Sequence, residues 1–455
     1  MRPLVRLAIV AAVVGLVVFY HAGATEHARM VNTERTRADQ SGYLWDAVAI
    51  HTDRHGGPST LIGERNRMPV YPWLLSWLYD PAMTPDQFFA VAKAWNIRAS
   101  LILLAAFAAI AFRRLPPLVA TNFVLSVAFG YYMFKAGYAQ VELLFYFLQF
   151  ATFLACCALL RSDGPKRTIA IGVLAGVLAA LSHLSKAAML PFAGLVLLVC
   201  GLRALAPVLR PRDYPDGATR RLAITRAGTA LVFVATFLLV LSPYLLNSKK
   251  HFGHYFYNVN STFYVWYDDW PAASMGTYRD GDGVGWPTTP PDRIPSARTY
   301  LRDHTAGQIA RRLYNGFAEM IAVSYTRLWY FKLTFMYGAL ALLLIVRGWR
   351  PFVAMVREAP AVFGFVGLYA VVYSAAVAFY QPISGTSLRM LLAHLAPFLF
   401  AVSALSAHAQ FRDLTWTVAG LTVSSRHFHL LLLVTILLDV VFVQWGRLMS
   451  QFAGY

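Results

Sequence analysis

Long apolar stretches recur along the whole chain and are separated by basic or aromatic connections. Eleven of these stretches, each of about 15 to 22 residues, reach or approach the length of about 20 apolar residues that a helix needs to cross the hydrocarbon core of a bilayer. The pattern predicts an all-α polytopic membrane protein, in which residues 1–455 form one transmembrane domain. The stretches lie near residues 4–20, 90–112, 116–134, 139–160, 168–184, 187–202, 227–246, 328–346, 360–380, 388–406 and 428–446.

Lys and Arg residues gather in every second connection, and this alternation predicts the orientation of the chain. Short cytoplasmic loops retain basic residues, so a start at Arg2 and Arg6 on the cytoplasmic side gives a self-consistent thread. The thread leaves residues 21–89 and 247–327 as two long external loops. The segments that it places in the cytoplasm are Arg113-Arg114, Arg161–Arg167, Arg203–Arg226, Arg347–Arg357 and Arg412–Arg426.

The composition agrees with a membrane protein: 58% of the residues are hydrophobic and 14% are charged. Part of the net charge of +18 is explained by the cytoplasmic loops, and the remainder lies outside, where it suits anionic lipid or phosphate. Residues 1–24 have a second interpretation, because a basic start, an apolar core and Ala22-Gly23-Ala24 are also typical of a cleavable signal peptide. Cleavage there would leave the remaining topology unchanged.

The sequence contains no nucleotide-binding fingerprint and no Gly-rich phosphate loop, and nucleic acid is not expected as a partner. Its three cysteines, Cys156, Cys157 and Cys200, fall inside predicted spans and form no CxxC pattern. A membrane enzyme of this kind would have to take any activated group from a molecule that is already in the membrane.

The first external loop opens with a lone acidic residue, Asp39, and carries two short amphipathic runs. Residues 39–50 predict one interfacial helix that ends at Gly56-Gly57-Pro58, and residues 71–79 predict a second, rich in Trp and Leu. Aromatic residues favour headgroup depth, so both helices are expected on the outer surface of the bilayer. Arg67 precedes the second helix.

Charged residues also stand at the ends of three predicted spans. Glu142, Lys186 and Arg389 each lie within about a turn of a span end, where a charge either faces a partner or snorkels to the interface. His183 is three residues before Lys186, a spacing that predicts one shared helix face. Asp439 is expected to face a neighbouring helix within the last span.

Several separated stretches together resemble one family, the multi-span GT-C glycosyltransferases that use polyprenyl-phosphate sugars, in particular protein O-mannosyltransferases and lipid A aminoarabinose transferases. That family opens its first external loop with Asp-Glu and a following Tyr, which Asp39-Gln40 and Tyr43 resemble. Its Lys-Pro-Pro-Leu-Tyr-Tyr-Trp-like run into a juxtamembrane helix resembles Arg67–Trp73. Later resemblances, in family order, are Leu184–Ala188, Pro243–Gly253 and Arg389–Pro397.

Two departures from the family stand out. Gln40 replaces the usual glutamate, and no sizeable C-terminal soluble domain follows the spans. Glu142, Asp46 and Glu64 are the candidates to supply the missing second acid.

The resemblance implies transfer of a sugar from an undecaprenyl- or decaprenyl-phosphate donor to a hydroxyl of a lipid, glycan or protein, on the periplasmic face of a bacterial inner membrane. Asp39 is the expected general base, and Glu142 is expected to orient the acceptor or a metal. Arg67, Lys186 and Arg389 are expected to bind the donor phosphate. Further candidates for acceptor or sugar contacts are Tyr43, Tyr71, Glu64 and His183.

Other interpretations remain open from the sequence. A divalent metal ion is a candidate cofactor, and His51 and His55, spaced i, i+4 around Asp53, could form half of a metal site or simply a solvated helix face. A lipid or oligosaccharide transporter or flippase is an alternative, although inverted repeats and broken helices are not evident. A glycan ligase or polymerase is another, although such enzymes usually place their large external loop late in the chain.

Overall fold

The computed structural model describes residues 3–53, 67–162, 164–209, 218–273, 292–384, 387–418 and 420–450. Within these ranges, eleven helices are long and apolar enough to cross a membrane. Each of them overlaps one of the eleven stretches expected from the sequence, which confirms a helical, multi-pass membrane protein. The spanning segments are α1 (Pro3–Met30), α4 (Pro85–Arg114), α5 (Pro117–Val127) continued by η2 (Ala128–Tyr132) and α6 (Met133–Ala136), α7 (Glu142–Leu160), α8 (Pro165–Ser185), α9 (Leu190–Leu209), α10 (Ala218–Phe252), α15 (Leu328–Arg347), α17 (Pro360–Ser384), α18 (Ser387–Leu392) continued by α19 (Leu395–Ala407), and α21 (Ser425–Asp439) continued by η6 (Val440–Gln444) and α22 (Trp445–Met449).

Helix ends are set by local residues that an apolar run alone does not reveal. Helix α4 begins several residues before its predicted stretch, because Thr84 caps it and Gln87 completes a reciprocal capping box. The helix ends at Arg114, just before Leu115 adopts an extended backbone ahead of Pro116. Spans therefore exceed the apolar runs that predict them.

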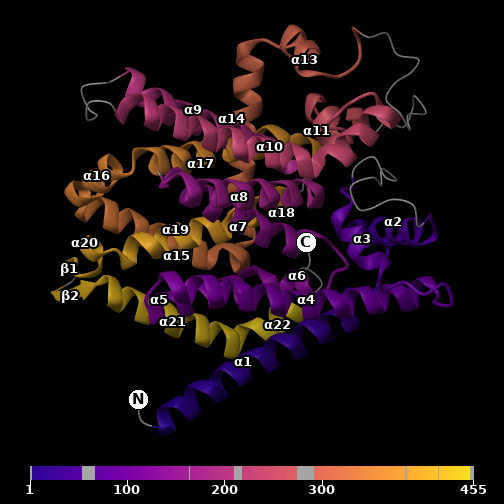
Figure 1. The fold of residues 1–455 in the computed structure, drawn as a ribbon. Helices are drawn as coiled ribbons and strands as arrows, with labels where there is room; N and C mark the ends of the chain where they lie inside the picture. Colours follow the sequence, from indigo (N-terminus) through magenta and orange to yellow (C-terminus); the bar gives the residue numbers. More distant parts are fainter. Residues whose placement is uncertain are drawn as a thin grey trace.

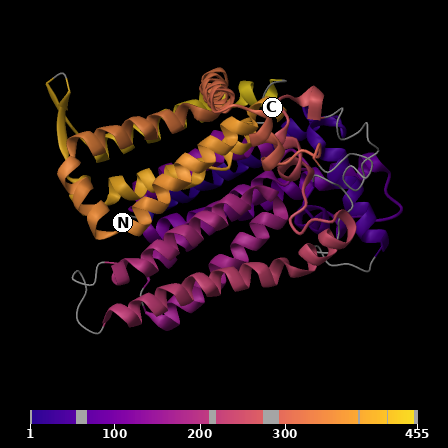
Figure 2. The same ribbon diagram turned by 90° about the horizontal axis from the view of Figure 1, so that it is seen from above.

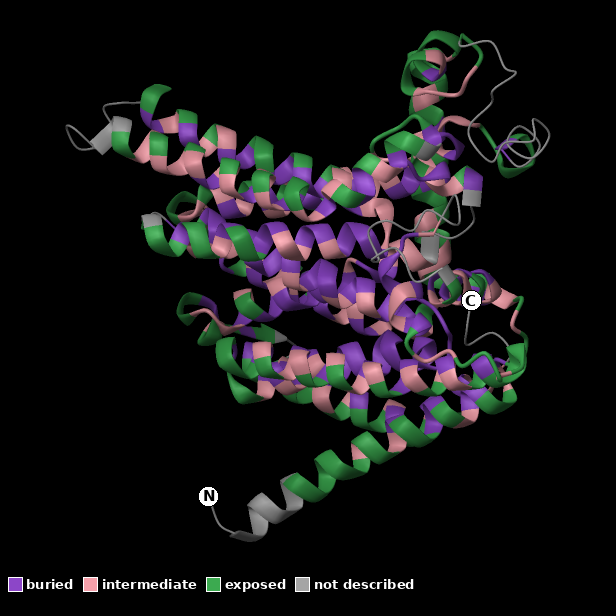
Figure 3. Cartoon of the chain, turned by 45° about the vertical axis from the view of Figure 1, so that its right-hand side comes forward, coloured by how far each residue is buried: buried purple, intermediate pink, exposed green. Residues whose placement is uncertain are grey.

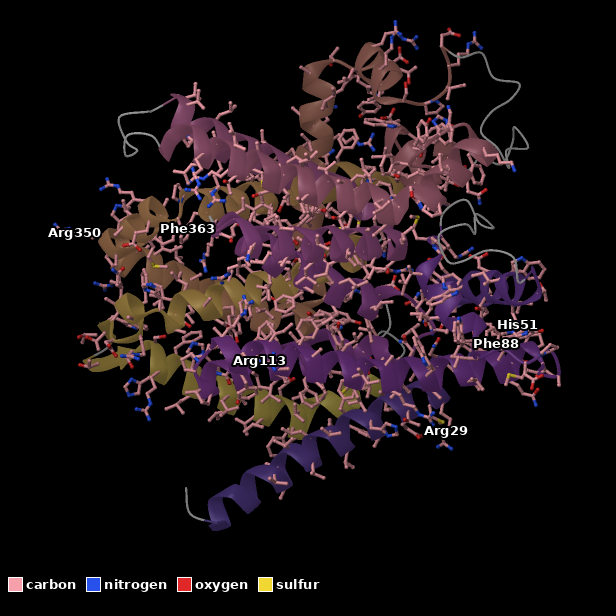
Figure 4. The ribbon with its side chains drawn as sticks, viewed as in Figure 1. Arg29, His51, Phe88, Arg113, Arg350 and Phe363 are labelled. Atoms are coloured by element: carbon pink, nitrogen blue, oxygen red, sulfur yellow. The ribbon has the colours of Figure 1, made fainter. Side chains whose placement is uncertain are left out.

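Successive spans run in alternate directions, so the short connections gather at opposite ends of the bundle (Figure 1). One end carries α16 (Trp349–Glu358), α20 (Ala409–Arg412) and a hairpin of β1 (Thr415–Val418) and β2 (Leu421–Ser424). Arg113 and Arg350 lie toward this end, away from His51 (Figure 4). The basic connections predicted to share one side therefore do so.

The opposite end carries the short helices of the two long connections. They are η1 (Arg37–Asp39), α2 (Gln40–Asp53), α3 (Val70–Ser76), α11 (Val259–Thr262), η5 (Tyr264–Trp266), α13 (Ala297–Asp303) and α14 (Ala306–Thr326). The short turn η3 (Ala187–Met189) joins α8 to α9 at the same end. Helix α14 runs across the direction of the spans, as Figures 1 and 2 show.

Two features go beyond the expected pattern. The hairpin pairs Thr415 with Ser424 in antiparallel register, within the Arg412–Arg426 segment that the sequence predicted only as a cytoplasmic connection. The 21-residue α14 was not expected as a helix within the second long connection. By contrast, the expectation that Asp439 faces a neighbouring helix is confirmed, because its carboxylate pairs with Lys332 of α15 and lies 3.5 Å from Arg447 of α22.

The core is aromatic and lies where α4, α5, α7 and α19 meet (Figure 3). Phe107, Phe123, Phe150 and Phe400 pack with ring centroids 4.8–6.0 Å apart. Such ring contacts add to the stabilisation that comes from burying apolar area. These contacts tie α4, α5, α7 and α19 together.

The two helices expected in the first long connection are present as α2 and α3. Tyr43, Ala47 and Ile50 are buried on one face of α2, as the pattern predicts, whereas Trp45 is 74% exposed. Trp77, just after α3, is equally exposed. The helices thus pack one face on the bundle and present tryptophans outward, the arrangement of interfacial helices.

Candidate functional site

Four charged side chains from distant parts of the chain meet at the end of the bundle next to α2. Arg389 Nη1 on α18 donates a hydrogen bond of 2.9 Å to Asp39 Oδ2 at the end of η1. The same nitrogen lies 3.5 Å from Glu142 Oε1, at the first residue of α7. Lys186 Nζ donates to that Glu142 oxygen at 3.3 Å. We call Asp39, Glu142, Lys186 and Arg389 the ionic cluster.

Glu142 is the buried centre of the ionic cluster, with a side chain 2% exposed. A buried carboxylate is tolerated only where it is paired, and here two cations flank it. Its place in the first turn of α7 adds the favourable field of a helix N-terminus. Its second oxygen, Oε2, has no hydrogen-bond partner among the described residues. Of the two sequence interpretations, the structure shows pairing rather than snorkelling.

Arg389 and Lys186 are placed by the ends of their own elements. The Tyr146 hydroxyl of α7 donates to the Arg389 carbonyl at 3.0 Å, which fixes α18 against α7. Helix α8 ends at Ser185, and Lys186 follows with an extended backbone. His183 and Lys186 therefore do not share a helix face: the helix stops between them.

Lys135 is a member of the site that the sequence interpretation missed. It lies at the end of α6, is 2% exposed, and interacts electrostatically with Glu142, Arg389 and Lys186. Its only signal in the sequence was a lysine near the end of an apolar stretch, which is also the mark of ordinary interfacial anchoring.

Arg67, Tyr43 and Tyr71 form the wall of the site on the side of α2 and α3. The Tyr43 ring packs edge-on against Tyr71 with centroids 5.3 Å apart, and the Arg67 guanidinium lies 5.7 Å from the Tyr43 centroid. Burial raises the pKa of Tyr43 well above its usual value, Glu142 and Asp39 raise it further, and Arg67 and Arg389 oppose them. The Tyr43 hydroxyl thus stays neutral, and it interacts electrostatically with the two carboxylates as well as with Arg67 and Arg389.

The backbone at Asp39 adopts an unusual conformation. Ala38 and Asp39 have φ of 58° and 67°, and they are the only non-glycine residues with positive φ in the described part of the chain. This left-handed region is tolerated by aspartate but costs energy for alanine. The side-chain amide of Gln140 donates to the Ala38 carbonyl and holds the turn from the other side.

Gln40 lies behind this turn and does not face the ionic cluster. Its side-chain amide exchanges two hydrogen bonds of 2.9 Å with the amide of Asn32, and its oxygen also accepts from the backbone N–H of Ala139 at 2.9 Å. Its nitrogen further donates to the Arg37 carbonyl at 3.0 Å. A glutamate would lose these donated bonds, so the amide fits this position better than an acid would.

Among the described residues, Glu142 is the candidate for the second acid that shares Arg389 with Asp39. Asp46 is buried on α2. Glu64 lies outside the described residues, so its expected contact with acceptor or sugar stays a prediction. The ionic cluster together with Arg67 and Lys135 thus holds two carboxylates and four cations.

His183 and His51, which the sequence named as candidates, make the following contacts outside the ionic cluster. The His183 ring, 2% exposed, packs between Phe237 and Phe256 at centroid distances of 6.3 and 5.8 Å. His51 Nδ1 lies 3.0 Å from the Ser76 carbonyl, and His55 is outside the described residues. In the ranges that the structure describes, no three His, Cys, Asp or Glu side chains gather as a metal site.

The structure has an apolar cavity of about 350 Å³, and Leu391, two residues after Arg389, lines it. It lies between α14, α15, α17 and α19. Leu391 and His394, which follow Arg389 in the sequence, are among the residues that line its wall. The polar atoms on this wall are bonded to each other: Tyr369 Oη lies 2.5 Å from His394 Nδ1 and accepts from Gln149 at 3.1 Å. Its other lining residues are Phe153, Ser324, Phe331, Thr334, Phe335, Val366, Ala370, Tyr373, Ser374, Val377, Leu395, Pro397, Phe398 and Ala401.

Fold and site together define a multi-pass helical membrane protein with an ionic cluster of two carboxylates and two cations at the end of its spans and an apolar cavity near it. Comparison with known proteins adds no family: no family model matches the sequence, and a search of curated proteins finds no match. Function therefore has to be argued from the site.

Proposed function

We propose that this protein is a membrane glycosyltransferase that moves a sugar from a polyprenyl-phosphate donor to a hydroxyl of a lipid, glycan or protein. The observation that carries the proposal is the ionic cluster, in which Arg389 and Lys186 converge with Asp39 and Glu142 directly beside an apolar cavity. A phosphate carried on a long hydrocarbon has both the charge and the apolar part that this pair of features fits.

The reaction needs few groups. The acceptor oxygen bonds to the anomeric carbon of the sugar, the bond from that carbon to the phosphate oxygen breaks, and polyprenyl phosphate leaves with the electron pair. Asp39, whose side chain is 53% exposed, takes the acceptor proton. Arg389, Lys186 and Arg67 stabilise the negative charge on the departing phosphate.

Glu142 has a positioning role in this scheme. Because it is buried between Lys186 and Arg389, it holds both cations at one place. Its unbonded Oε2 leaves one acceptor for a sugar hydroxyl, in keeping with the expectation that Glu142 orients a substrate. Tyr43 and Tyr71 offer rings and a neutral hydroxyl on the opposite wall, suited to a sugar.

We assign the site to the periplasmic side of a bacterial inner membrane, as the resemblance implies. The basic connections at the other end of the bundle support this orientation, because the positive-inside rule places such connections in the cytoplasm. A transporter or flippase would have to pass its cargo across the bundle, whereas the ionic cluster lies at one end of it. These observations favour chemistry on one face.

The test is turnover of purified protein with a panel of polyprenyl-phosphate hexoses and pentoses and with lipid, glycan and peptide acceptors. Asp39→Asn should lower the transfer rate by about 10² to 10⁴ because the base is lost. Asp86→Asn is the matched control, since it breaks an exposed ion pair with Arg35 at the same end of the molecule. Wild-type rates in Asp39→Asn would show that Asp39 is not the base, and no transfer from any donor by the wild type would refute the proposal.

A further inference from the structure

Arg389 is shared by two carboxylates that differ sharply in their surroundings. Asp39 accepts its hydrogen bond at 2.9 Å with a side chain 53% exposed, whereas Glu142 lies at 3.5 Å with 2% exposed. Arg389 itself is 17% exposed, and Asp39 is the more exposed of its two carboxylate partners. The guanidinium and the proposed base therefore occupy each other in this state.

This pairing occupies one atom of each group that the proposed roles need. Asp39 Oδ2 accepts a hydrogen bond from Arg389 Nη1 at 2.9 Å, so that oxygen faces the guanidinium and not an acceptor hydroxyl. The N–H that Arg389 donates to Asp39 is at the same time not available to a phosphate. Proton transfer to Oδ2 and phosphate binding through that N–H therefore both need the pair to open.

The local geometry favours separation of Asp39, rather than Glu142, from Arg389. Glu142 is fixed in the first turn of α7 and held by Lys186 as well. Asp39 follows Ala38 in a left-handed backbone that is unfavourable for alanine and persists only where surrounding contacts hold it. The ion pair to Arg389 is one of those contacts, and the bond from Gln140 to the Ala38 carbonyl is another.

We propose that Arg389 passes from Asp39 to the donor phosphate, so that donor binding is what frees Asp39 to act as the base. The inference rests on the proposed function and adds an order to it: the lipid-linked donor binds first, and the acceptor is deprotonated only afterwards. When polyprenyl phosphate leaves, Arg389 returns to Asp39 and the site is closed again. In this order of events, Asp39 Oδ2 is released from Arg389 only when there is a sugar to transfer.

The passage of Arg389 from Asp39 to the phosphate, here called the handover, predicts a change in lipid affinity that a preformed phosphate site would not show. Asp39 and the phosphate compete for Arg389, so Asp39→Asn should bind undecaprenyl monophosphate more tightly than wild type, by roughly two- to tenfold. The measurement is equilibrium binding of this lipid to purified protein in nanodiscs, with undecaprenol as the phosphate-free control. Asp86→Asn should bind like the wild type.

A double-mutant cycle separates competition from the mere loss of a negative charge. In an Arg389→Gln background, Asp39→Asn should no longer change the affinity, because the shared partner is gone. Arg389→Lys is the second background if the glutamine variant does not give a monodisperse peak, and there the gain should be smaller than in the wild type.

The outcomes distinguish the inference from the function on which it rests. If the wild type binds undecaprenyl monophosphate no better than undecaprenol, the proposed donor class is wrong. If the wild type binds it and Asp39→Asn binds equally or more weakly, the handover is overturned while the donor class stands. A gain that persists without Arg389 would likewise overturn it.

Discussion

Gln40 and Asp39 are neighbours in the sequence, and the structure gives their side chains different contacts. Gln40 is completely buried and bonds to Asn32 and Ala139, so it ties the turn before α2 to the connection before α7. Asp39 faces Arg389. The amide thus helps to hold the conformation that presents the carboxylate, a task in which its donated hydrogen bonds are needed.

Gly42 is a second residue whose size matters at the site. A Cβ added there would overlap the guanidinium of Arg67, which is the far end of a flexible side chain. Gly42→Ala should therefore preserve the fold, with a favourable change in helix propensity of up to about 1 kcal/mol, and displace Arg67. We expect weaker binding of undecaprenyl monophosphate, approaching that of Arg67→Ala, in nanodisc binding assays.

Gly338→Ala is the matched control for Gly42→Ala, because nothing lies within 4 Å of a Cβ at Gly338. It should bind the lipid as the wild type does. Equal affinity in Gly42→Ala and the wild type would show that the Arg67 guanidinium does not contribute to the phosphate site.

Individual residues could be predicted where a charge stood in an unusual place. Glu142 and Arg389 each carry a charge at the end of an apolar stretch, and Asp39 is the lone acid that opens the first external loop. Lys135 and Gln140 could not be singled out, because their contacts come from chain segments that are distant in sequence. His183 packs among aromatic rings, and a histidine in such surroundings has the same sequence signal as one that faces a substrate, so its contact with acceptor or sugar stays a prediction.

Helix α14 is the element that the sequence did not predict and that borders the apolar cavity. Its polar residues interrupt any run long enough to resemble a span, yet one face is packed: Gly316 lies against the backbone of Ala378 in α17. Arg312, 6% exposed, donates to the Phe379 carbonyl at 2.8 Å and to the Tyr300 hydroxyl at 3.1 Å. These contacts hold α14 across the bundle.

Gly316→Ala should loosen α14. The added Cβ would overlap the Ala378 carbonyl, which is backbone and cannot rotate away, so we expect a loss of roughly 1–3 kcal/mol and a lower Tm in detergent. Gly307→Ala in the first turn of the same helix has no close neighbour but Thr305 at 3.9 Å and should leave Tm unchanged or raise it. Equal melting of both variants would contradict the close packing of α14 on α17.

Spans were predictable as elements and short helices less so. A run of apolar residues determines that a helix forms within the bilayer, whatever its neighbours. The hairpin at residues 415–424 and helix α14 depend on local turns and on tertiary packing, which hydropathy does not report. Helices α2 and α3 were found because their aromatic faces are strongly patterned.

For the whole molecule, the number of spans between the connection before α2 and the connection after α19 is odd, so these two connections lie on opposite sides of the membrane. Thr33 is exposed after α1, and Gln410 is exposed on α20. With intact cells, a membrane-impermeant maleimide should label Thr33→Cys and not Gln410→Cys, whereas both should react after permeabilisation. The reverse pattern would place the ionic cluster in the cytoplasm.

The central claim is that the ionic cluster and the adjacent cavity bind a lipid-linked phosphate. The most direct measurement is mass spectrometry of lipids that co-purify with the protein from its native membrane. The account predicts polyprenyl monophosphate or its sugar ester with the wild type and with Asp86→Asn, and roughly tenfold less with Arg389→Gln, because a charge-assisted phosphate contact is lost. Recovery of ordinary phospholipids alone, or of equal polyprenyl phosphate with Arg389→Gln, would contradict it.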